Sequence, residues 1–322
     1  MAGLGEFELI DRIRHRAATR ADVRLGIGDD AAVLAPRSGH ELVVTTDSLV
    51  EGVHFAVADA AADVGWKALA VNLSDLAAMG AQAAWATLAL TLPEPDSDWL
   101  DAFLDGFLEL ATKHQVALVG GDLTRGPRTI GVTAIGWVPE GRALQRGGAR
   151  SGDAVCVTGT LGDAGGALAL REHGRAGDAV LSGRLHRPTP RLAAGVALRG
   201  FASACIDLSD GLLADLGHIG QASGVGAEVE LARLPASAAL AQAFDEADRW
   251  PLQLAAGDDY ELCFALAPSH LEQARAALLA EGIAMHCIGR IVAGSGVCVI
   301  APDGSDYRPP RSGYAHFGGD GA

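Results

Sequence analysis

The sequence predicts a two-domain fold of the α/β or α+β class. The chain has 322 residues, and domains average about 150 residues, so two domains are expected. Hydrophobic residues make up 49% of the chain, enough for a sizeable core. Short β-rich runs alternate with segments of helical periodicity throughout, which favours mixed layers of strands and helices.

The first half of the chain predicts three helices and four strands. Leu4, Phe7, Ile10 and Ile13 recur at helical spacing, and Asp59 and Asp96 or Ser97 can begin two further helices. The strands are β-rich runs bounded by turn residues. The predicted helices are 4–16, roughly 60–80, and one beginning near 97 with Trp99, Phe103, Phe107 and Leu110 as its apolar stripe. The predicted strands are 42–46 ending at Asp47, 87–92, 116–119 leading into Gly120, and 130–138.

A segment rich in arginine and glycine, residues 141–152, separates the two halves. We expect an N-terminal domain over 1–145 and a C-terminal domain over 146–322. The second half continues the alternation of strands and helices. Its predicted strands are 154–158, 204–207, 227–231, 260–266, 286–292 and 297–301. One predicted helix begins near 163, a second follows Pro190, and two more cover 211–222 and 271–281.

Charge and composition exclude several classes of protein. The net charge is −15, which disfavours binding to nucleic acid or to an anionic membrane surface. No apolar run approaches the ~18 residues of a membrane span. Glu6, Glu8 and Asp11 argue against a signal peptide, and five cysteines without C-x-x-C spacing indicate free thiols. We therefore expect a cytoplasmic protein without a nucleic-acid or membrane partner.

Carboxylates beside glycine or at strand ends are the informative pattern. They occur in Gly26-Ile-Gly-Asp-Asp30, Thr45-Thr-Asp47, Gly120-Gly-Asp122, Asp207-Leu-Ser-Asp-Gly211 and Gly257-Asp-Asp-Tyr-Glu261, where lysine and arginine are scarce. If several converge, their repulsion requires bound cations or raised pKa values. Hard oxygen ligands suit Mg²⁺, which commonly bridges to the phosphates of a substrate. The pattern therefore predicts that the protein binds a phosphate-containing ligand through Mg²⁺.

Taken singly, an Asp beside Gly is more often a turn or helix-cap residue than a ligand. Asp75 differs, because it lies within an otherwise apolar helix with Asn72 one turn earlier. An unpaired buried carboxylate is costly, so we interpret Asp75 as a ligand. The run from Gly159 to Gly165 follows a strand, but its glycines are spaced three and three, so we interpret it as structural and not as a dinucleotide fingerprint.

Together these motifs resemble the thiamine-monophosphate kinase family. The matching segments occur in the family's order over nearly the whole chain. They are Leu25-Gly-Ile-Gly-Asp-Asp30, Thr45-Thr-Asp-Ser-Leu49 with His54-Phe55, Lys67 to Ala81, Gly120-Gly-Asp-Leu-Thr-Arg-Gly126, Ile206-Asp-Leu-Ser-Asp-Gly-Leu212 and Asp259-Tyr-Glu-Leu262. The resemblance implies a fold like that of aminoimidazole ribonucleotide synthetase, with the N-terminal sheet pairing across a homodimer.

The resemblance also implies an activity. ATP would donate its γ-phosphoryl group to thiamine phosphate, giving thiamine diphosphate and ADP by direct in-line attack, with several Mg²⁺ ions held by aspartates. The N-terminal domain would bind ATP and Mg²⁺ and form the dimer. Because the acceptor phosphate is already a nucleophile, positioning and charge neutralisation suffice for catalysis.

The residues implied by the resemblance fall into three groups. The positions that match metal ligands are Asp30, Thr45, Thr46, Asp47, Asp75, Asp122, Asp207 and Asp210, whose aspartates are also the expected catalytic residues. The positions that match ATP contacts are Gly121, Asp122, Arg146 and Ser209. The positions that match thiamine phosphate contacts are His54, Glu261 and Phe317. His54 and Arg146 can donate to phosphate, Glu261 can accept from an aminopyrimidine, and Phe317 can stack on a ring.

Two alternatives stay open. One is a sister enzyme of the same superfamily, such as one resembling aminoimidazole ribonucleotide synthetase. Selenophosphate synthetase is disfavoured because it needs a reactive cysteine near the N-terminus, and the first cysteine here is Cys156. The other is a non-catalytic acidic metal-binding protein, although the spacing of a calcium loop is absent.

Overall fold

The computed structural model describes residues 5–175 and 177–314. It divides into two compact units, one formed by 1–76 with 81–141, and one formed by 77–80 with 142–322. Each unit contains its own mixed sheet covered by helices. The predicted α/β fold class is confirmed.

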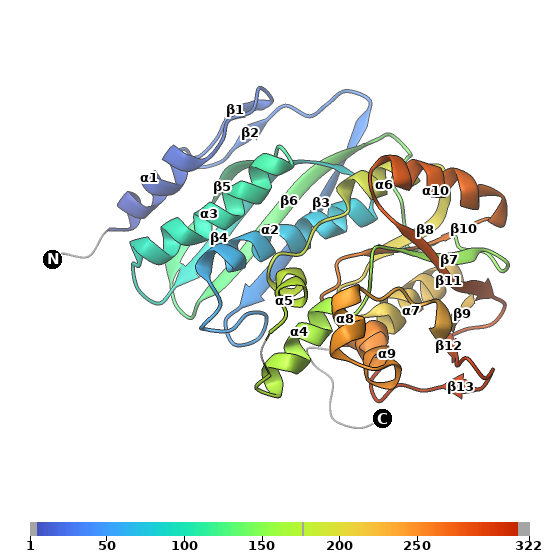
Figure 1. The fold of residues 1–322 in the computed structure, drawn as a ribbon. Coiled ribbons are helices and arrows are strands. Elements are labelled where there is room, and N and C mark those ends of the chain that lie inside the picture. Colours follow the sequence, from blue (N-terminus) through green and yellow to red (C-terminus); the bar gives the residue numbers. More distant parts are fainter. Residues whose placement is uncertain (1–4, 176, 315–322) are drawn as a thin grey trace. The chain divides into compact units, whose positions relative to one another are not determined.

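The first unit is built on a four-stranded sheet of order β3-β6-β4-β5. These strands are β3 (His40–Val50), β4 (Gln82–Leu92), β5 (Ala117–Arg125) and β6 (Thr129–Pro139). Only β4 and β5 run parallel. The helices α2 (Ala61–Ala78) and α3 (Ser97–Lys113) lie along one face of the sheet (Figure 1). The remaining elements are α1 (Glu6–Arg16) and the short ribbon of β1 (Val23–Leu25) and β2 (Val33–Leu34).

Glycine permits the close approach of α2 and α3. A Cβ at Gly106 would lie 1.7 Å from the carbonyl oxygen of Ala62, and one at Gly65 would lie 1.9 Å from that of Phe103. Three residues of the expected stripe of α3, Phe103, Phe107 and Leu110, are each at 0% exposure, whereas the fourth, Trp99, is half-buried. Asp96 caps the helix by accepting from the Trp99 N–H. This packing holds α2, and therefore Asp75, firmly over the sheet.

The second unit has a seven-stranded sheet of order β13-β12-β9-β11-β7-β10-β8, in which only β12 and β9 pair in parallel. Its strands are β7 (Ala154–Thr158), β8 (Ala202–Asp207), β9 (Gly226–Glu230), β10 (Leu262–Leu266), β11 (Met285–Val292), β12 (Val297–Ile300) and β13 (Asp306–Tyr307).

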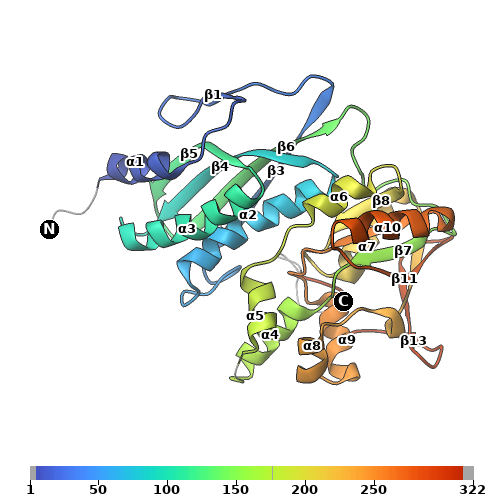
Figure 2. The ribbon, with the colours of Figure 1, turned by 45° about the horizontal axis from the view of Figure 1, so that its top comes forward.

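Helices cover both faces of this sheet. One face packs on α7 (Leu212–Ser223), whose Leu212, Leu216 and Ile219 are buried with Val155 and Val157 of β7. Figure 2 shows α6 (Leu192–Leu198) and α10 (Leu271–Ala280) side by side. The other helices are α4 (Asp163–Glu172), α5 (Ala179–His186), α8 (Ala238–Ala243) and α9 (Glu246–Ala255), with 3₁₀ turns at Leu231–Arg233 and Pro268–His270.

Several strands extend beyond their expected bounds, and two of these extensions carry carboxylates. β3 continues through Asp47 to Val50, and β5 continues through Gly120 and Asp122 to Arg125. The reason is pairing, because all eleven residues of β3 have partners on β6 and the end of β5 pairs with β4. Asp47 and Asp122 therefore project from ordered strands and not from loops, which fixes their positions more tightly.

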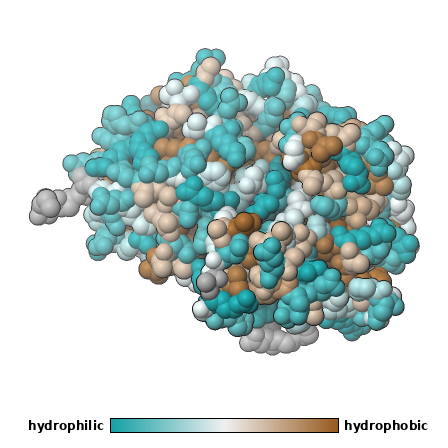
Figure 3. All heavy atoms as spheres, in the orientation of Figure 1, coloured by the Kyte–Doolittle hydropathy of each residue, from teal (hydrophilic) through white to brown (hydrophobic). Residues whose placement is uncertain are grey.

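Hydrophilic and hydrophobic residues are mixed over the visible surface, and the hydrophobic residues form small patches there (Figure 3). Within the described residues no helix is long and apolar enough to cross a membrane. All five cysteines are free; three are buried and two, Cys287 and Cys298, are half-buried.

Candidate active site

In the first unit, the structure brings Thr45 and Asp75 together. The Thr45 hydroxyl on β3 donates to Oδ2 of Asp75 on α2 at 2.5 Å. Asp47 lies two residues further along β3 and therefore points to the same side of the sheet. Asp75 is half-buried between neighbours of α2 that are fully buried, such as Leu76. A hydroxyl and two carboxylates thus gather between the sheet and α2.

Asn72 adds a further oxygen to this part of α2. It is fully buried, and its Nδ2 donates to the Ala68 carbonyl at 3.0 Å, while its Oδ1 has no hydrogen-bond partner among the described residues. A buried oxygen without a donor is the situation that a cation or an ordered water relieves. The all-oxygen donor set and this orphaned atom fit Mg²⁺.

Asp122 lies on β5, at the opposite edge of the same sheet from β3. Asp47 pairs with Val132, Val132 pairs with Leu88, and Leu88 pairs with Gly121, so these four residues form one row across the sheet. Asp122 belongs to the next row. With strands spaced ~4.8 Å apart, β3 and β5 are separated by about 14 Å. One metal ion cannot bridge that distance, so Asp47 and Asp122 cannot bind the same ion within this sheet.

Gly121 allows β5 to pass close to β4. Its φ is +155°, and a Cβ would lie 1.9 Å from the carbonyl oxygen of Leu88. Any other residue would push Asp122 away from its position at this edge of the sheet. Thr46 is exposed, and its hydroxyl donates to the Val132 carbonyl at 3.1 Å and accepts from Thr133 at 3.1 Å.

Asp30 lies on the loop between β1 and β2. It is exposed, and its N–H donates to the Asp29 carboxylate at 2.9 Å. Gly28 just before it has φ +119°, and a Cβ there would meet the Arg14 guanidinium at 2.9 Å. The loop is therefore shaped by glycine, and both carboxylates face solvent.

His54 follows β3 in a turn anchored by the buried Phe55. The Val50 N–H donates to Nδ1 of His54 at 3.0 Å, and the Gly52 N–H donates to the Phe55 carbonyl at 2.8 Å. Because Nδ1 accepts a hydrogen bond, Nε2 carries the ring proton in the neutral histidine. The turn therefore makes His54 a hydrogen-bond donor through Nε2.

In the second unit, the expected residues lie near the ends of two paired strands, where β8 ends and β10 begins. Asp207 ends β8 and pairs with Leu262, the first residue of β10, and it is buried at 4% exposure. Ser209 and Asp210 form the turn that follows. The Asp258 N–H donates to the Ser209 carbonyl at 2.9 Å, so the segment before Glu261 packs on the same turn.

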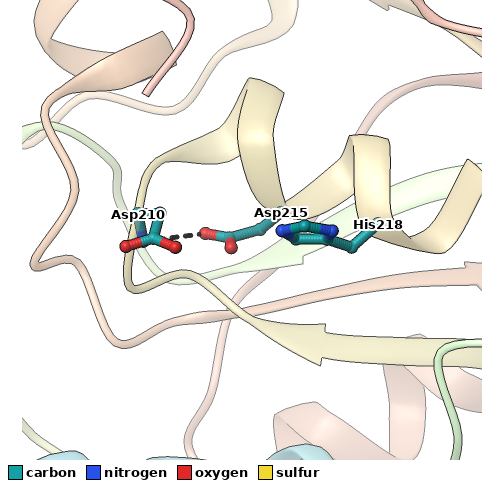
Figure 4. A group of neighbouring side chains, drawn as sticks. All are labelled: Asp210, Asp215 and His218. Atoms are coloured by element: carbon teal, nitrogen blue, oxygen red, sulfur yellow. Dashed lines mark hydrogen bonds between the residues drawn. The ribbon is translucent and has the colours of Figure 1, made fainter. Parts of the chain in front are cut away.

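Asp215 and His218 extend this group beyond the residues expected from the sequence (Figure 4). Oδ2 of Asp215 accepts from the N–H groups of Asp210 and Gly211, each at 3.1 Å. Burial, followed by the negative charge of Asp210, raises the pKa of Asp215 to about 7. Ligand atoms of Asp210, Asp215 and His218 lie within 4.8 Å of one another. The signal in the sequence was the helical spacing of Asp215 and His218, three residues apart.

Glu261 is already hydrogen-bonded through both carboxylate oxygens within the protein. It is buried at 1% exposure, and it accepts from the Thr158 hydroxyl at 2.6 Å and from Nε of Arg191 at 2.6 Å. Nη2 of Arg191 donates to its second oxygen. A Cβ at Gly159 would lie 2.2 Å from that carboxylate. Sequence reasoning expected Glu261 to accept from substrate, and it missed Arg191, which no motif had singled out.

Strain marks the segment that leads to Glu261. Asp258 and Tyr260 adopt φ of +59° and +48°, which is rare for residues other than glycine. The Tyr260 hydroxyl donates to Asp258 at 2.9 Å. Such conformations persist where the surroundings determine them fully, often at functional sites. Of the remaining expected residues, Arg146 is exposed in the segment before β7, and Phe317 lies outside the described residues.

Known protein families and curated proteins resemble this chain along most of its length. The family model of the AIR synthase related protein N-terminal domain matches residues 28–138, and that of the C-terminal domain matches residues 150–301. The chain is 46% identical over 322 residues to thiamine-monophosphate kinase of Escherichia coli K12, covering 97% of this chain and 98% of that protein.

Solved structures show the same similarity. Thiamine-monophosphate kinase from Stenotrophomonas maltophilia K279a superposes with a TM-score of 0.86 at 51% identity, covering 95% of this chain and 98% of the other. AaThiL complexed with AMPPCP and TMP superposes with a TM-score of 0.78 at 34% identity, covering 98% and 97%.

Proposed function

The chain belongs to the AIR synthase related proteins and, within them, to the thiamine-monophosphate kinase family, and we propose that it transfers the γ-phosphoryl group of ATP to thiamine phosphate. The products would be thiamine diphosphate and ADP. The observation that carries the proposal is the 46% identity to the Escherichia coli kinase along 97% of this chain. AaThiL, solved with AMPPCP and TMP together, supports a site that takes a nucleotide and TMP at once.

The proposed metal ligands divide between the two units. In the first unit they are Asp30, Thr45, Thr46, Asp47, Asp75 and Asp122, and in the second they are Asp207 and Asp210. The donor set is entirely oxygen, which suits Mg²⁺. When bound, Mg²⁺ supplies neutralisation of the phosphate charge that accumulates during transfer. The separation of Asp47 from Asp122 across the sheet supports more than one ion.

The chain's own groups would orient the two substrates. Gly121 and Asp122, with Arg146 and Ser209, are the proposed contacts to ATP. Nε2–H of His54 would donate to the phosphate of thiamine phosphate, a role that the hydrogen bond from Val50 to Nδ1 supports. The acceptor phosphate then attacks the γ-phosphorus in line, and no strong general base is needed.

A panel of acceptors tests the proposal. The protein is incubated with ATP and Mg²⁺, and ADP is measured with thiamine phosphate, with thiamine, with an aminoimidazole-type ribonucleotide precursor, and with no acceptor. We expect ADP only with thiamine phosphate, and none after chelation with EDTA. Turnover with the ribonucleotide alone would favour a sister enzyme, and magnesium binding without turnover would favour a non-catalytic protein.

A further inference from the structure

Two cysteines of the second unit face each other across neighbouring strands. Cys156 of β7 pairs with Cys287 of β11, and the two strands run antiparallel, side by side in the sheet (Figure 1). Side chains of directly opposed residues stand on the same face of the sheet, and the Cα atoms of such residues lie about 4.5 or 5.5 Å apart. A disulfide spans Cα separations of about 4.4–6.8 Å. The strand register therefore places the two thiols within reach of one another.

The two thiols differ in exposure and in acidity. Cys156 is buried at 0% exposure, whereas Cys287 is half-buried. Their mutual hydrogen bond, together with burial, raises the pKa of Cys156 far above its ordinary value. The same hydrogen bond lowers the pKa of Cys287 to about 6, against the effect of burial. Because the thiolate is the reactive form of cysteine, Cys287 is the reactive member of the pair and Cys156 is its protected neighbour.

The other three cysteines lack this combination. Cys205 and Cys263 are buried at 1% and 0% exposure, and burial raises the pKa of both thiols. Cys298 is half-buried, but burial and the hydrogen bond that its thiol donates to Asp306 raise its pKa. Solvent access, a lowered pKa and an opposed thiol therefore coincide only at Cys287.

The strand β11 is irregular beside Cys287. Its register against β7 shifts between Cys287 and Gly289. An irregularity of this kind interrupts the ladder of hydrogen bonds and bends the strand locally. Cys287 can therefore approach Cys156 without disrupting a regular run of strand pairing.

We propose that Cys156 and Cys287 form a reversible disulfide when the protein meets hydrogen peroxide. The Cys287 thiolate attacks one peroxide oxygen, the O–O bond breaks, hydroxide leaves, and Cys287 becomes a sulfenic acid. The Cys156 thiol then attacks the Cys287 sulfur, the S–O bond breaks, and the leaving hydroxyl takes the Cys156 proton as water. The hydroxide of the first step takes the proton that Cys287 had released. Two thiols thus lose two electrons, and one peroxide becomes two waters.

The arrangement gives the buried thiol a role. A sulfenic acid without a partner is open to further oxidation to the sulfinic acid, which is irreversible for most proteins. Cys156, directly opposite, captures the sulfenic acid of Cys287 first, and a thiol reductant can then restore both residues. The pair needs no substrate of the proposed kinase reaction, so its chemistry can be measured without turnover.

Mass spectrometry of the full chain tests the pair. Protein reduced with dithiothreitol and then freed from it is treated with hydrogen peroxide, unfolded and alkylated with iodoacetamide. Five alkylated cysteines are expected before oxidation and three after it, because two of the five are then bonded. Proteolysis without reductant should yield one pair of linked peptides, which contain Cys156 and Cys287. Dithiothreitol should restore alkylation of all five cysteines.

Substitutions test which thiols are needed. Cys156→Ala should lose the linked peptides, and no other pair should replace them. Cys298→Ala, at the other half-buried thiol, is the matched control and should give the wild-type yield of linked peptides. If circular dichroism shows that Cys156→Ala does not fold, Cys287→Ser decides, because it should lose the linked peptides as well.

Three outcomes would overturn the proposal. The first is oxidised wild-type protein in which all five cysteines are still alkylated. The second is a disulfide that includes Cys298 or that joins two chains. The third is a folded Cys156→Ala or Cys287→Ser variant that still forms an intramolecular disulfide in wild-type yield.

Discussion

Thr45 and Asp75 are 30 positions apart, and their hydrogen bond is the most direct residue-scale support for a metal site in the first unit. Asp75→Asn keeps the size of the side chain and removes its charge. We expect a folded protein with turnover lowered about 10²- to 10³-fold, as for loss of one electrostatic stabiliser of a transition state. Circular dichroism checks the fold and ADP release checks turnover. Near-normal turnover at saturating Mg²⁺ would show that Asp75 is not a ligand.

His54 and Asp122 are expected to affect different substrates. His54→Ala removes the donor proposed for thiamine phosphate, so the KM for that substrate should rise about ten- to a hundred-fold while the KM for ATP changes little. Asp122→Ala should impair the use of both ATP and Mg²⁺. Kinetics with each substrate varied in turn separate the two. A His54 variant that shifts only the ATP constant would place the acceptor site elsewhere.

Asp259 is expected to make stability depend on pH. Burial raises its pKa well above the ordinary value, although the Gly162 N–H that it accepts works in the opposite direction. A raised pKa contributes stability below the unfolded value of 3.8, and that contribution is lost as pH rises toward the folded value. Asp259→Asn keeps the acceptor for Gly162 and removes the titration.

The variant should therefore gain stability relative to wild type as pH rises from 5 to 8, by at most about 1.4 kcal/mol per pH unit for one proton. Urea unfolding at three pH values measures the difference. Parallel stability curves for the two proteins would mean that Asp259 is ionised normally.

Residue types and spacing were enough to propose which side chains carry the chemistry, but not to predict what each one touches. Asp75 could be singled out because a carboxylate in an apolar helix needs a partner. The internal hydrogen bonds of Glu261 could not be recognised, because Thr158 and Arg191 reach it from 103 and 70 positions away. Contacts of such sequence separation leave no local pattern.

At the scale of elements, β3 is the exposed edge of its sheet and carries hydrophobic residues on its free face. Leu42 and Val44 are 51% and 61% exposed. An unpaired apolar edge strand invites pairing with a second chain, which supports the proposed homodimer. Light scattering should give twice the 32.9 kDa of one chain.

The double variant Leu42→Lys with Val44→Lys should dissociate that dimer by placing charges on the paired surface. Leu279→Lys, at a 71% exposed leucine on α10, is the control and should stay dimeric. A wild-type protein that scatters as a single chain at micromolar concentration would contradict the dimer.

Periodicity located some elements well and missed others. The strand 154–158 was predicted with its observed ends, and α3 with its buried stripe. The ribbon of β1 and β2 and the helices α5 and α8 were not predicted, because each is short and gains its stability from tertiary contacts. The helix α9 was also not predicted, and it contains Pro251, a residue that argues against a helix. β3 runs past Asp47 because pairing with Val132 outweighs the poor strand propensity of aspartate.

At the scale of the whole molecule, both units contribute proposed ligands, the first from sheet faces and α2, the second from strand ends and the turn before α7. The motifs therefore had to be weighed together, since any single Asp beside Gly is an ordinary turn. Their order along the chain carried the family assignment that the comparisons then showed.

The central claim is direct phosphoryl transfer from ATP to thiamine phosphate. Incubation with ATP labelled at the γ-phosphorus and with thiamine phosphate tests it in one measurement. The label should appear in the terminal phosphate of thiamine diphosphate, with one ADP formed for each labelled product and none of the label on the protein. Label released as inorganic phosphate, or retained on the protein as a competent intermediate, would contradict the account.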